Sequence, residues 1–184
     1  MGNNGELIRA NFVMLSTSLT FKDFINDIYG EKLISIYDYE SLLCKNRIEQ
    51  NTEFLLHMDM YGNVVQEVFM KWLKTNNVTL NSDFNKKDLN IIESLQFDRN
   101  IIRRAYVLFS KCLNARAIAP RLYENSLLNQ EKFYEILQEP SRRRQVTLLL
   151  DRITNTRSFT CFINALSEYQ FDLYKEFINN STIV

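Results

Sequence analysis

Residues 139–166 read EPSRRRQVTLLLDRITNTRSFTCFINAL, and the spacing of the apolar residues in this stretch decides the fold. Leu149 and Ile153 lie four residues apart, and a second apolar series at positions 159, 162, 163 and 166 continues the same intervals. Intervals of three and four residues are the period of an α-helix and differ from the alternation of a strand. The stretch therefore predicts two helices, near residues 141–154 and 157–168.

The helical period continues on both sides of this stretch. Asn129 is the predicted N-cap of one further helix, and Pro140-Ser141 marks the start of the next. The chain of 184 residues contains only four Gly and two Pro, which suits short-looped helical bundles better than turn-rich β-architectures. The second half is predicted to be a six-helix bundle, with its other helices near residues 98–116, 118–125, 129–138 and 171–179.

The chain also repeats itself. Residues from Leu7 onward align with residues from Ile101 onward at a constant offset of 94, without a gap for roughly sixty residues. A period this long indicates a duplicated domain rather than a solenoid, whose units are about 20 to 50 residues long. Ten positions are identical in the two copies, and most are candidates for the core: Ile8/Ile102, Arg9/Arg103, Val13/Val107, Ser16/Ser110, Leu19/Leu113, Tyr29/Tyr123, Leu33/Leu127, Leu43/Leu137, Leu55/Leu149 and Leu56/Leu150.

The first copy has the same helical pattern as the second. Ser35 is the predicted cap of its third helix, and Gly62 is predicted to break the chain. A polar loop at 76–85 should precede an apolar stripe that completes the first bundle. The helices of this copy are predicted near residues 5–19, 20–30, 35–46, 48–60, 63–75 and 86–96, which divides the chain into domains 1–96 and 97–184.

The second copy resembles the caspase recruitment domain (CARD) family over residues 101–178. The resemblance rests on the segment 139–145, on Leu148 to Asp151, and on the series Phe159, Phe162, Ala165 and Leu166. The first copy is similar to the same family through fewer residues, among them Arg9, Tyr39 and Gly62. Tandem death-effector domains share the fold, but the Arg-rich fourth helix favours recruitment domains. The resemblance implies an all-α chain with two tandem six-helix antiparallel Greek-key bundles, the death fold.

Charge differs between the two halves. Residues 1–98 carry nine Lys and Arg against fourteen Asp and Glu, whereas residues 99–184 carry thirteen against eight, so the net charges are −5 and +5. The candidate interaction residues of the second copy lie on its first and fourth predicted helices: Arg103, Arg104, Arg142, Arg143, Arg144 and Arg152. Those of the first copy lie on its second and third: Asp23, Asp27, Glu31, Asp38 and Glu40.

The resemblance implies that each of these two sets gathers on one face, because the family packs the first helix beside the fourth and the second beside the third. Recruitment domains commonly associate by docking a basic face of this kind onto an acidic one. An exposed ion pair contributes at most about 1 kcal/mol, so several pairs must act together.

No catalytic residue, cofactor site or metal site is predicted. His57 is the only histidine, and no Cys lies near it at ligand spacing. The three cysteines, Cys44, Cys112 and Cys161, are predicted to be buried structural thiols. No stretch approaches 18 consecutive apolar residues, and no apolar signal-peptide core follows the first residues, so we expect a cytoplasmic protein without a membrane span.

The leading functional hypothesis is a non-enzymatic adaptor or regulator that binds a CARD-containing protein, an initiator caspase or its activating scaffold, or that self-assembles. One alternative is a nucleic-acid-binding helical module that uses the Arg cluster on phosphates, although the zero net charge of the chain opposes it. The other alternative is an amino-terminal prodomain of a longer caspase or sensor.

Overall fold

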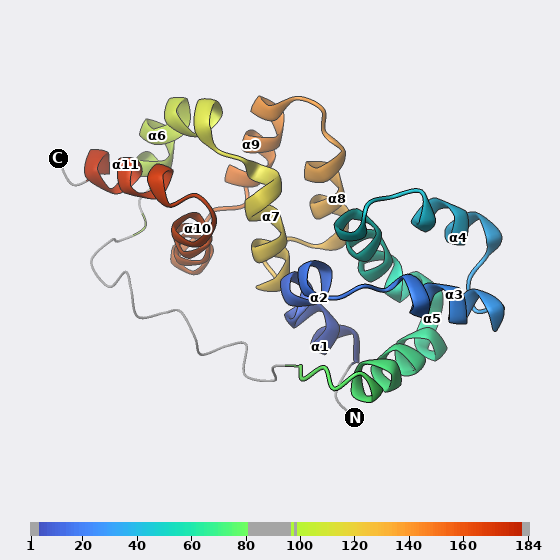
Figure 1. Cartoon of the computed structure of the whole chain (residues 1–184). Coiled ribbons are helices and arrows are strands. Elements are labelled where there is room, and N and C mark those ends of the chain that lie inside the picture. Colours follow the sequence, from blue (N-terminus) through green and yellow to red (C-terminus); the bar gives the residue numbers. More distant parts are fainter. Residues whose placement is uncertain (1–3, 81–96, 98, 182–184) are drawn as a thin grey trace. The chain divides into compact units, whose positions relative to one another are not determined.

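The computed structural model describes residues 4–80, 97 and 99–181, which form helices and connecting loops and no strand (Figure 1). The all-α prediction is therefore confirmed for these residues. The chain divides into two compact units, Met1–Ser82 and Asp83–Val184. The predicted helix at 86–96 lies outside the described residues, so the predicted boundary after residue 96 stays a prediction.

The first unit begins with two short helices where the sequence predicts one. A bend at Asn11 separates α1 (Asn4–Ala10) from α2 (Phe12–Ser18), and the buried Asn11 amide donates a hydrogen bond to the Leu7 carbonyl at 2.8 Å. The side chain of Asn thus competes with the backbone for hydrogen bonds, which is why it bends a helix. The remaining helices of this unit are α3 (Lys22–Gly30), α4 (Ile36–Leu43) and α5 (Arg47–Thr75).

Helix α5 contains a kink at Gly62, where the sequence predicts a break. Gly62 has φ 83° and ψ 173°, a conformation open almost only to glycine. The two halves of α5 on either side of this residue correspond to the two helices predicted at 48–60 and 63–75. The prediction of a chain break at Gly62 is confirmed.

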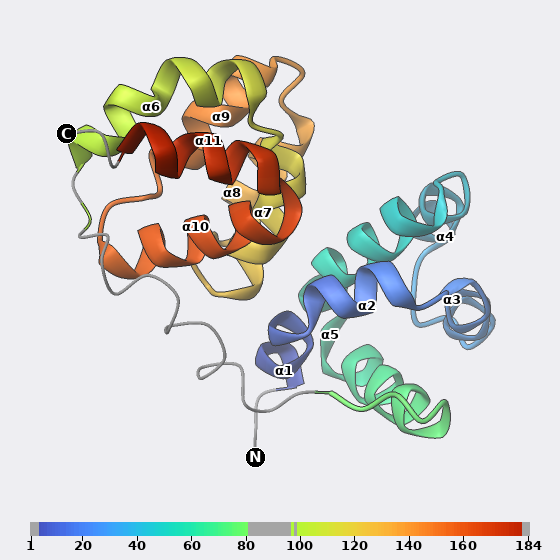
Figure 2. The ribbon, with the colours of Figure 1, turned by 60° about the vertical axis from the view of Figure 1, so that its left-hand side comes forward.

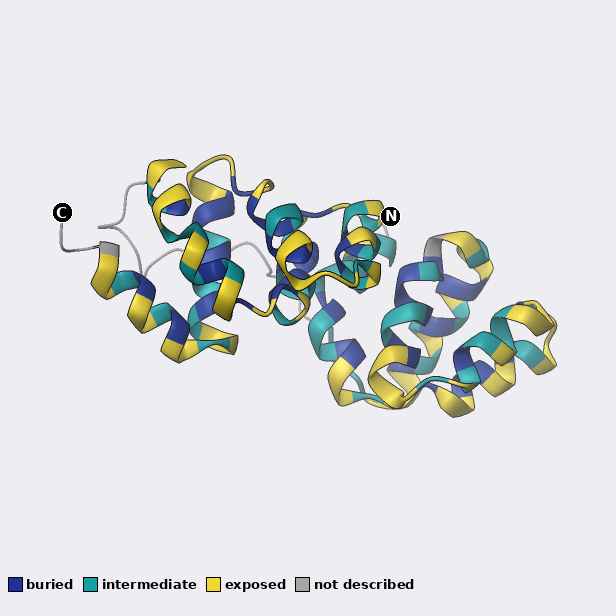
Figure 3. Cartoon of the chain, turned by 90° about the horizontal axis from the view of Figure 1, so that it is seen from above, coloured by how far each residue is buried: buried dark blue, intermediate teal, exposed yellow. Residues whose placement is uncertain are grey.

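An aromatic cluster fills the core of the first unit. Phe21 contacts Phe69 edge to face, with ring centroids 5.2 Å apart, and Phe24 packs against Phe54 at 5.6 Å. Trp72, the only tryptophan, lies 5.4 Å from Phe24 and packs against this cluster while remaining half-buried. Figure 3 shows the buried residues on the inward faces of the helices and the exposed residues on the outward faces.

The second unit contains six helices among its described residues, and their bounds agree with the predicted ones to within a few residues. Helix α6 packs against α9 and α11, and α7 packs against α8, α9 and α10, so helices that are distant in sequence lie side by side (Figure 2). The six are α6 (Arg99–Cys112), α7 (Ala115–Glu124), α8 (Gln130–Gln138), α9 (Arg142–Leu150), α10 (Thr156–Tyr169) and α11 (Phe171–Ser181).

Local signals set the starts of these helices. The side chains at the N-cap positions each accept a hydrogen bond from the backbone N–H three residues on, which satisfies one otherwise unpaired donor of the first turn. The predicted cap Asn129 is one of them, and the others are Asn114, Ser141 and Asn155. The core that these helices enclose includes Phe109, Phe133, Phe159, Phe162 and Phe177, all fully buried.

The two units have the same turn conformation and the same aromatic contact at equivalent positions of the sequence repeat. The turn after α3 and the turn after α7 each place a non-glycine residue at φ 60°, and the N–H of that residue donates to a tyrosine carbonyl 2.9 Å away in both. A stacked aromatic pair then joins the two flanking helices, at 4.1 Å in the first unit and 4.9 Å in the second. The equivalent residues are Lys32/Ser126, Tyr29/Tyr123, Tyr39/Phe133 and the N-caps Ser35/Asn129, all 94 apart.

The offset changes by one residue at the fourth helix. The N-caps Asn46 and Ser141 are 95 positions apart, and so are the buried Gln50 and Gln145. The expected pairs Leu55/Leu149 and Leu56/Leu150 are therefore not structural equivalents. Because both copies have neighbouring apolar residues at this point, sequence identity did not distinguish an offset of 94 from one of 95.

Candidate protein-interaction faces

Helices α6 and α9 lie side by side and form the basic face, which we define by the six predicted arginines Arg103, Arg104, Arg142, Arg143, Arg144 and Arg152. All six are exposed. The hydroxyls of Tyr106 on α6 and Thr147 on α9 lie 2.9 Å apart and hold the two helices together. The expectation that the first and fourth helices of this copy are neighbours is confirmed.

The arginines of the basic face differ in what their side chains contact. Arg142 Nε donates a hydrogen bond to the Leu113 carbonyl at 3.2 Å, so this side chain ties the start of α9 to the end of α6. The first unit repeats the contact, because Arg47 Nη1 donates to the Leu19 carbonyl at 2.9 Å. Arg142 therefore has a structural role, although the sequence placed it with the interaction residues alone.

Arg143 and Arg144 are also exposed, and they have different contacts. The side chain of Arg144 is 78% exposed and forms a long ion pair, 3.7 Å from Nε to a carboxylate oxygen of Glu139. The hydrogen bond from Thr147 and, next, the guanidinium of Arg143 lower the pKa of the Tyr106 hydroxyl. Arg144 is therefore a highly accessible cation at the start of α9, whereas Arg143 also interacts with the Tyr106 hydroxyl.

An open groove of about 570 Å³ lies along the contact between α6 and α9. Arg99 and Arg103 line it from α6, and Asp151 at the end of α9 is the one carboxylate among its lining residues. Arg99 was not among the predicted interaction residues. Arg99 lies four residues before Arg103, and residues at this spacing share one helix face. This spacing could have predicted Arg99 as part of the same surface.

Val107 is an exposed apolar residue on the same helix. Its side chain is 61% exposed, although the sequence repeat made it a core candidate. Helical geometry explains the difference, because Val107 lies four residues after Arg103 and three after Arg104, on the outward face of α6. An exposed apolar side chain among arginines is a composition found in protein interfaces.

The acidic face consists of Asp23 and Asp27 on α3, Glu31 at the cap that ends α3, and Asp38 and Glu40 on α4. The stacked pair of Tyr29 and Tyr39 joins the two helices, and the Tyr39 hydroxyl donates to Asn26 Oδ1 at 3.0 Å. The expectation that these helices are neighbours is therefore confirmed.

Four of the five acidic residues are exposed, and Asp38 is half-buried. The Ser35 hydroxyl donates to Asp38 Oδ2 at 2.6 Å, and the Asp38 N–H donates to Ser35 Oγ at 3.1 Å. Asp38 therefore helps to cap α4 in addition to carrying charge. Tyr37, one residue earlier, is 81% exposed and was not among the predicted interaction residues.

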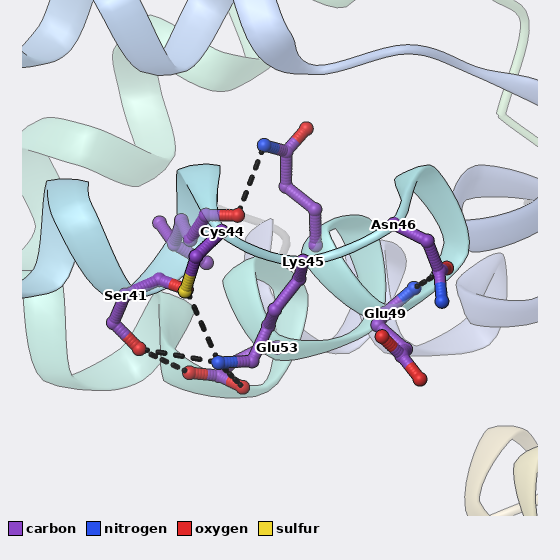
Figure 4. A network of polar contacts seen from close by, with 8 residues as sticks. Ser41, Cys44, Lys45, Asn46, Glu49 and Glu53 are labelled. Carbon is purple, nitrogen blue, oxygen red and sulfur yellow. Dashed lines mark hydrogen bonds and ion pairs between the residues drawn. The ribbon is translucent and has the colours of Figure 1, made fainter.

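A polar network beside the acidic face pairs further charges within the first unit (Figure 4). Lys45 Nζ lies 3.2 Å from Glu53 Oε2, and it also donates to the Ser41 carbonyl at 3.1 Å. The Ser41 hydroxyl donates to Glu53 Oε1 at 3.2 Å. Lys45 and Glu53 are thus paired with each other, whereas four of the five carboxylates of the acidic face are exposed.

The cysteines differ from the prediction of burial. Cys44, at the cap that ends α4, and Cys112, at the end of α6, are exposed, and Cys161 on α10 is half-buried. Among the residues that the structure describes, no group of three or more His, Cys, Asp or Glu side chains is arranged to hold a metal ion. Within the same residues, no helix combines the length and apolar character needed to cross a membrane.

An ion-pair cluster on α7 and α10 was also missed by the sequence reasoning. Arg121 Nη1 lies 2.6 Å from Glu124 Oε2, and Arg121 Nε lies 3.4 Å from Glu168 Oε2. The Glu124 side chain is only 1% exposed. Burial, and then the charge of Glu168, raise the pKa of the neighbouring Tyr169 to about 12.

Comparison with known proteins gives one match, and it falls on the second unit. No curated protein and no solved structure matches the chain. The model of the caspase recruitment domain family matches residues 99–179, which hold the six helices whose packing is described above. The second unit is thus similar to a kind of domain that serves protein interaction and not catalysis.

Proposed function

We propose that the chain is a non-enzymatic cytoplasmic adaptor or regulator. It binds CARD-containing partners, an initiator caspase or its activating scaffold, through homotypic contacts and controls their assembly in apoptosis or innate immune signalling. The observation that carries the proposal is the CARD at residues 99–179, whose neighbouring helices α6 and α9 present exposed arginines on one face. A domain of this kind passes on a signal through assembly.

The first unit is proposed to be a second CARD-like module, with module boundaries at 1–96 and 97–184. Two features support this interpretation. The turn at Lys32 has the backbone conformation of the turn at Ser126, and the Arg47 contact with Leu19 repeats that of Arg142 with Leu113. Contacts that recur at equivalent positions of two units indicate a common fold more strongly than apolar identities alone.

The two faces have separate roles in this proposal. On the basic face, guanidinium groups such as those of Arg143 and Arg144 pair with carboxylates of a partner, a geometry in which Arg is selective. On the acidic face, Asp23 and Asp27, one helical turn apart, offer carboxylates to a basic partner surface. Complementary fields speed encounter and exclude wrongly charged partners, and each single pair contributes little.

Binding of purified partner domains tests the proposal. The full chain is titrated onto immobilised CARDs of initiator caspases and of their scaffolds, and the same is done with the Arg143→Glu/Arg144→Glu variant. A matched control, Lys71→Glu/Lys74→Glu, makes the same charge change on exposed residues of α5. We expect the first variant to bind at least tenfold more weakly and the control to bind like the unaltered chain.

Two outcomes would contradict the proposal: no CARD binds the chain, or both variants bind as the unaltered chain does. The effect on the partner then separates an activator from an inhibitor. An activator shortens the lag before the partner domain forms clusters, measured by light scattering, and an inhibitor lengthens it.

Nucleic acid remains a second candidate ligand for one reason. The exposed guanidinium groups of Arg99 and Arg103 lie four residues apart on a groove that a phosphate backbone would fit electrostatically. A fluorescent duplex titrated with the chain at increasing salt tests this candidate. Affinity above that of a neutral control protein, falling linearly with the logarithm of salt concentration, would support it, and affinity equal to the control would remove it.

A further inference from the structure

The kink in α5 is one residue long. Helix α5 runs from Arg47 to Thr75, and the non-helical φ and ψ inside it belong to Gly62. The second unit differs at the equivalent place, because α9 ends at Leu150 and α10 begins at Thr156, and a capping box at Asn155 fixes that start. The second unit thus has a loop that stops both helices, whereas the first unit has a single glycine.

The buried face of α5 continues in phase across this glycine. Met58 before it and Val65 after it are both buried, and they lie seven residues apart, a spacing that returns to nearly the same side of a helix. Phe54, four residues before Met58, and Phe69, four residues after Val65, are buried as well. A helix that ran straight through Gly62 would therefore carry one continuous apolar stripe.

In the kinked helix, both parts of this stripe pack in one core. The ring centroid of Phe69, in the second part, lies 5.2 Å from that of Phe21 and 5.2 Å from that of Phe24. It also lies 5.6 Å from that of Phe54, in the first part. A straight α5 of 29 residues is about 44 Å long and would carry Phe69 away from this core. The same residues of a second copy fit the vacated place, because their side chains are identical.

We propose that two copies of the chain exchange residues 63–75, with Gly62 as the hinge and a straight α5 in each copy. The second part of α5 then packs on Phe21 and Phe24 of the other copy. Exchange of an identical element keeps its core contacts, so the two forms differ mainly at the hinge. The arrangement is two-fold and closed, so it ends at a dimer. It uses neither the basic face nor the acidic face and does not rest on the proposed function.

The exchanged dimer also covers a side of α5 that the kinked chain exposes. Four residues around the hinge alternate at intervals of four, three and four, the spacing of a coiled-coil seam: His57, Tyr61, Val64 and Val68. Val64 is 59% exposed, and the other three are half-buried. Two straight helices that cross antiparallel at the hinge would bring Val64 of each copy against Tyr61 of the other. Met60, 76% exposed, lies four residues before Val64 and flanks this contact.

Variants of the full chain shift the balance between the two forms in opposite directions. Gly62→Ala disfavours the kink, because φ 83° strains a residue with a Cβ, and it favours the straight helix through the higher helix propensity of Ala. Gly30→Ala is the matched control, because an added Cβ meets no atom within 4 Å at either glycine and only Gly62 has a positive φ. A third chain has Gly-Ser-Gly-Ser inserted after Gly62, which gives the kinked form a loop and interrupts the straight helix.

Each chain is refolded from urea over about a hundredfold range of protein concentration and sized by chromatography with light scattering, at high salt to screen contacts between charged faces. The unaltered chain should form more dimer at higher refolding concentration, and the dimer should survive dilution, because its return requires the core to open. Gly62→Ala should raise the association constant by about a hundredfold, which is about tenfold for each of two hinges. Gly30→Ala should match the unaltered chain, and the inserted chain should stay monomeric. In dilute solution Gly62→Ala has no copy to exchange with and should only lose stability.

The distance between two spin labels on one chain distinguishes exchange from any other dimer. The labels are attached at Glu49→Cys and Lys71→Cys, two exposed positions on either side of the hinge, in a chain whose three native cysteines are replaced by Ala. Refolding with an excess of unlabelled chain leaves only pairs within one chain to be measured. In a straight α5 the two Cα atoms lie about 33 Å apart, and any kink shortens this distance. We expect the long distance in the dimer and a shorter one in the monomer.

Three results would overturn the inference: an unaltered chain that stays monomeric at every refolding concentration, a Gly62→Ala chain that dimerises no more than Gly30→Ala, or a dimer that keeps the short distance between labels. The Arg143→Glu/Arg144→Glu variant separates this test from the partner test, because it should exchange as the unaltered chain does. A chain that exchanges but binds no CARD of a caspase or scaffold refutes the proposed partners and retains this inference. The reverse result retains the partners and refutes the exchange.

Discussion

Removal of one ring from the core of the second unit should unfold that unit and leave the first intact. Phe162 on α10 is fully buried, and its ring meets Phe109 edge to face at 5.5 Å and 89°. Phe162→Ala removes the whole ring from a site that other helices close, a change that costs about 3–5 kcal/mol. A unit of this size has roughly 4–12 kcal/mol of stability, so the variant loses a large part of it.

Urea unfolding with two probes measures the effect. Trp72, the only tryptophan, packs against the buried Phe24 of the first unit, so its fluorescence reports that unit alone, whereas far-UV circular dichroism reports the helices of both. We expect Phe162→Ala to move part of the dichroism change to lower urea and to leave the Trp72 midpoint unchanged. Phe24→Ala, in contact with Trp72, should lower the Trp72 midpoint instead.

Val107→Ala is the surface control in the second unit, because this side chain is 61% exposed. Its effect should stay within about 0.5 kcal/mol. A loss below about 1 kcal/mol for Phe162→Ala would refute the assignment of Phe162 to the core. An equal shift of the Trp72 midpoint would refute the separation of the chain into two cores.

Three further predictions concern single positions. Arg142→Glu should destabilise the second unit by about 1 kcal/mol more than Arg143→Glu in thermal unfolding, because only Arg142 donates to a backbone carbonyl. Gly62→Ala should lower the Trp72 fluorescence midpoint by an equivalent of about 1–3 kcal/mol, because φ 83° strains any residue with a Cβ. The raised pKa of Tyr169, about 12, favours its protonated form in the folded chain, so this contribution is complete below pH about 10. It is lost as pH rises through about 12, and Tyr169→Phe should lessen the loss of stability measured by urea unfolding over that interval.

The sequence predicted the helices of the second unit well, because each has an apolar stripe and a polar cap. The stripe of Phe159, Phe162 and Leu166 is fully buried as expected, and Asn129 caps α8 as expected. The bend at Asn11 was missed, since a side-chain amide that bonds to its own helix leaves no break in the apolar period. The change of offset at the fourth helix was missed because adjacent leucines fit either register.

The candidate faces were predicted in outline from charge on neighbouring helices. Charge alone did not reveal that Arg142 is bound to the Leu113 carbonyl or that Asp38 takes part in a cap. The contact of Arg142 with Leu113 depends on how α9 packs beside α6, and the contact of Asp38 with Ser35 depends on the turn that starts α4. The exposure of Val107 was also predicted wrongly. The identity of one apolar residue does not show whether its side chain faces the core or the solvent.

The sequence by itself determined that this chain is helical, that its pattern repeats, and that one half is acidic and the other basic. Those properties depend on local period and on composition, which act over a few residues. Only the tertiary structure decided which arginines are accessible, where the second copy gains a residue, and which positions of the two units are equivalent. These depend on contacts between helices far apart in the chain, and the direction of each side chain is set by the packing of its whole helix against the core.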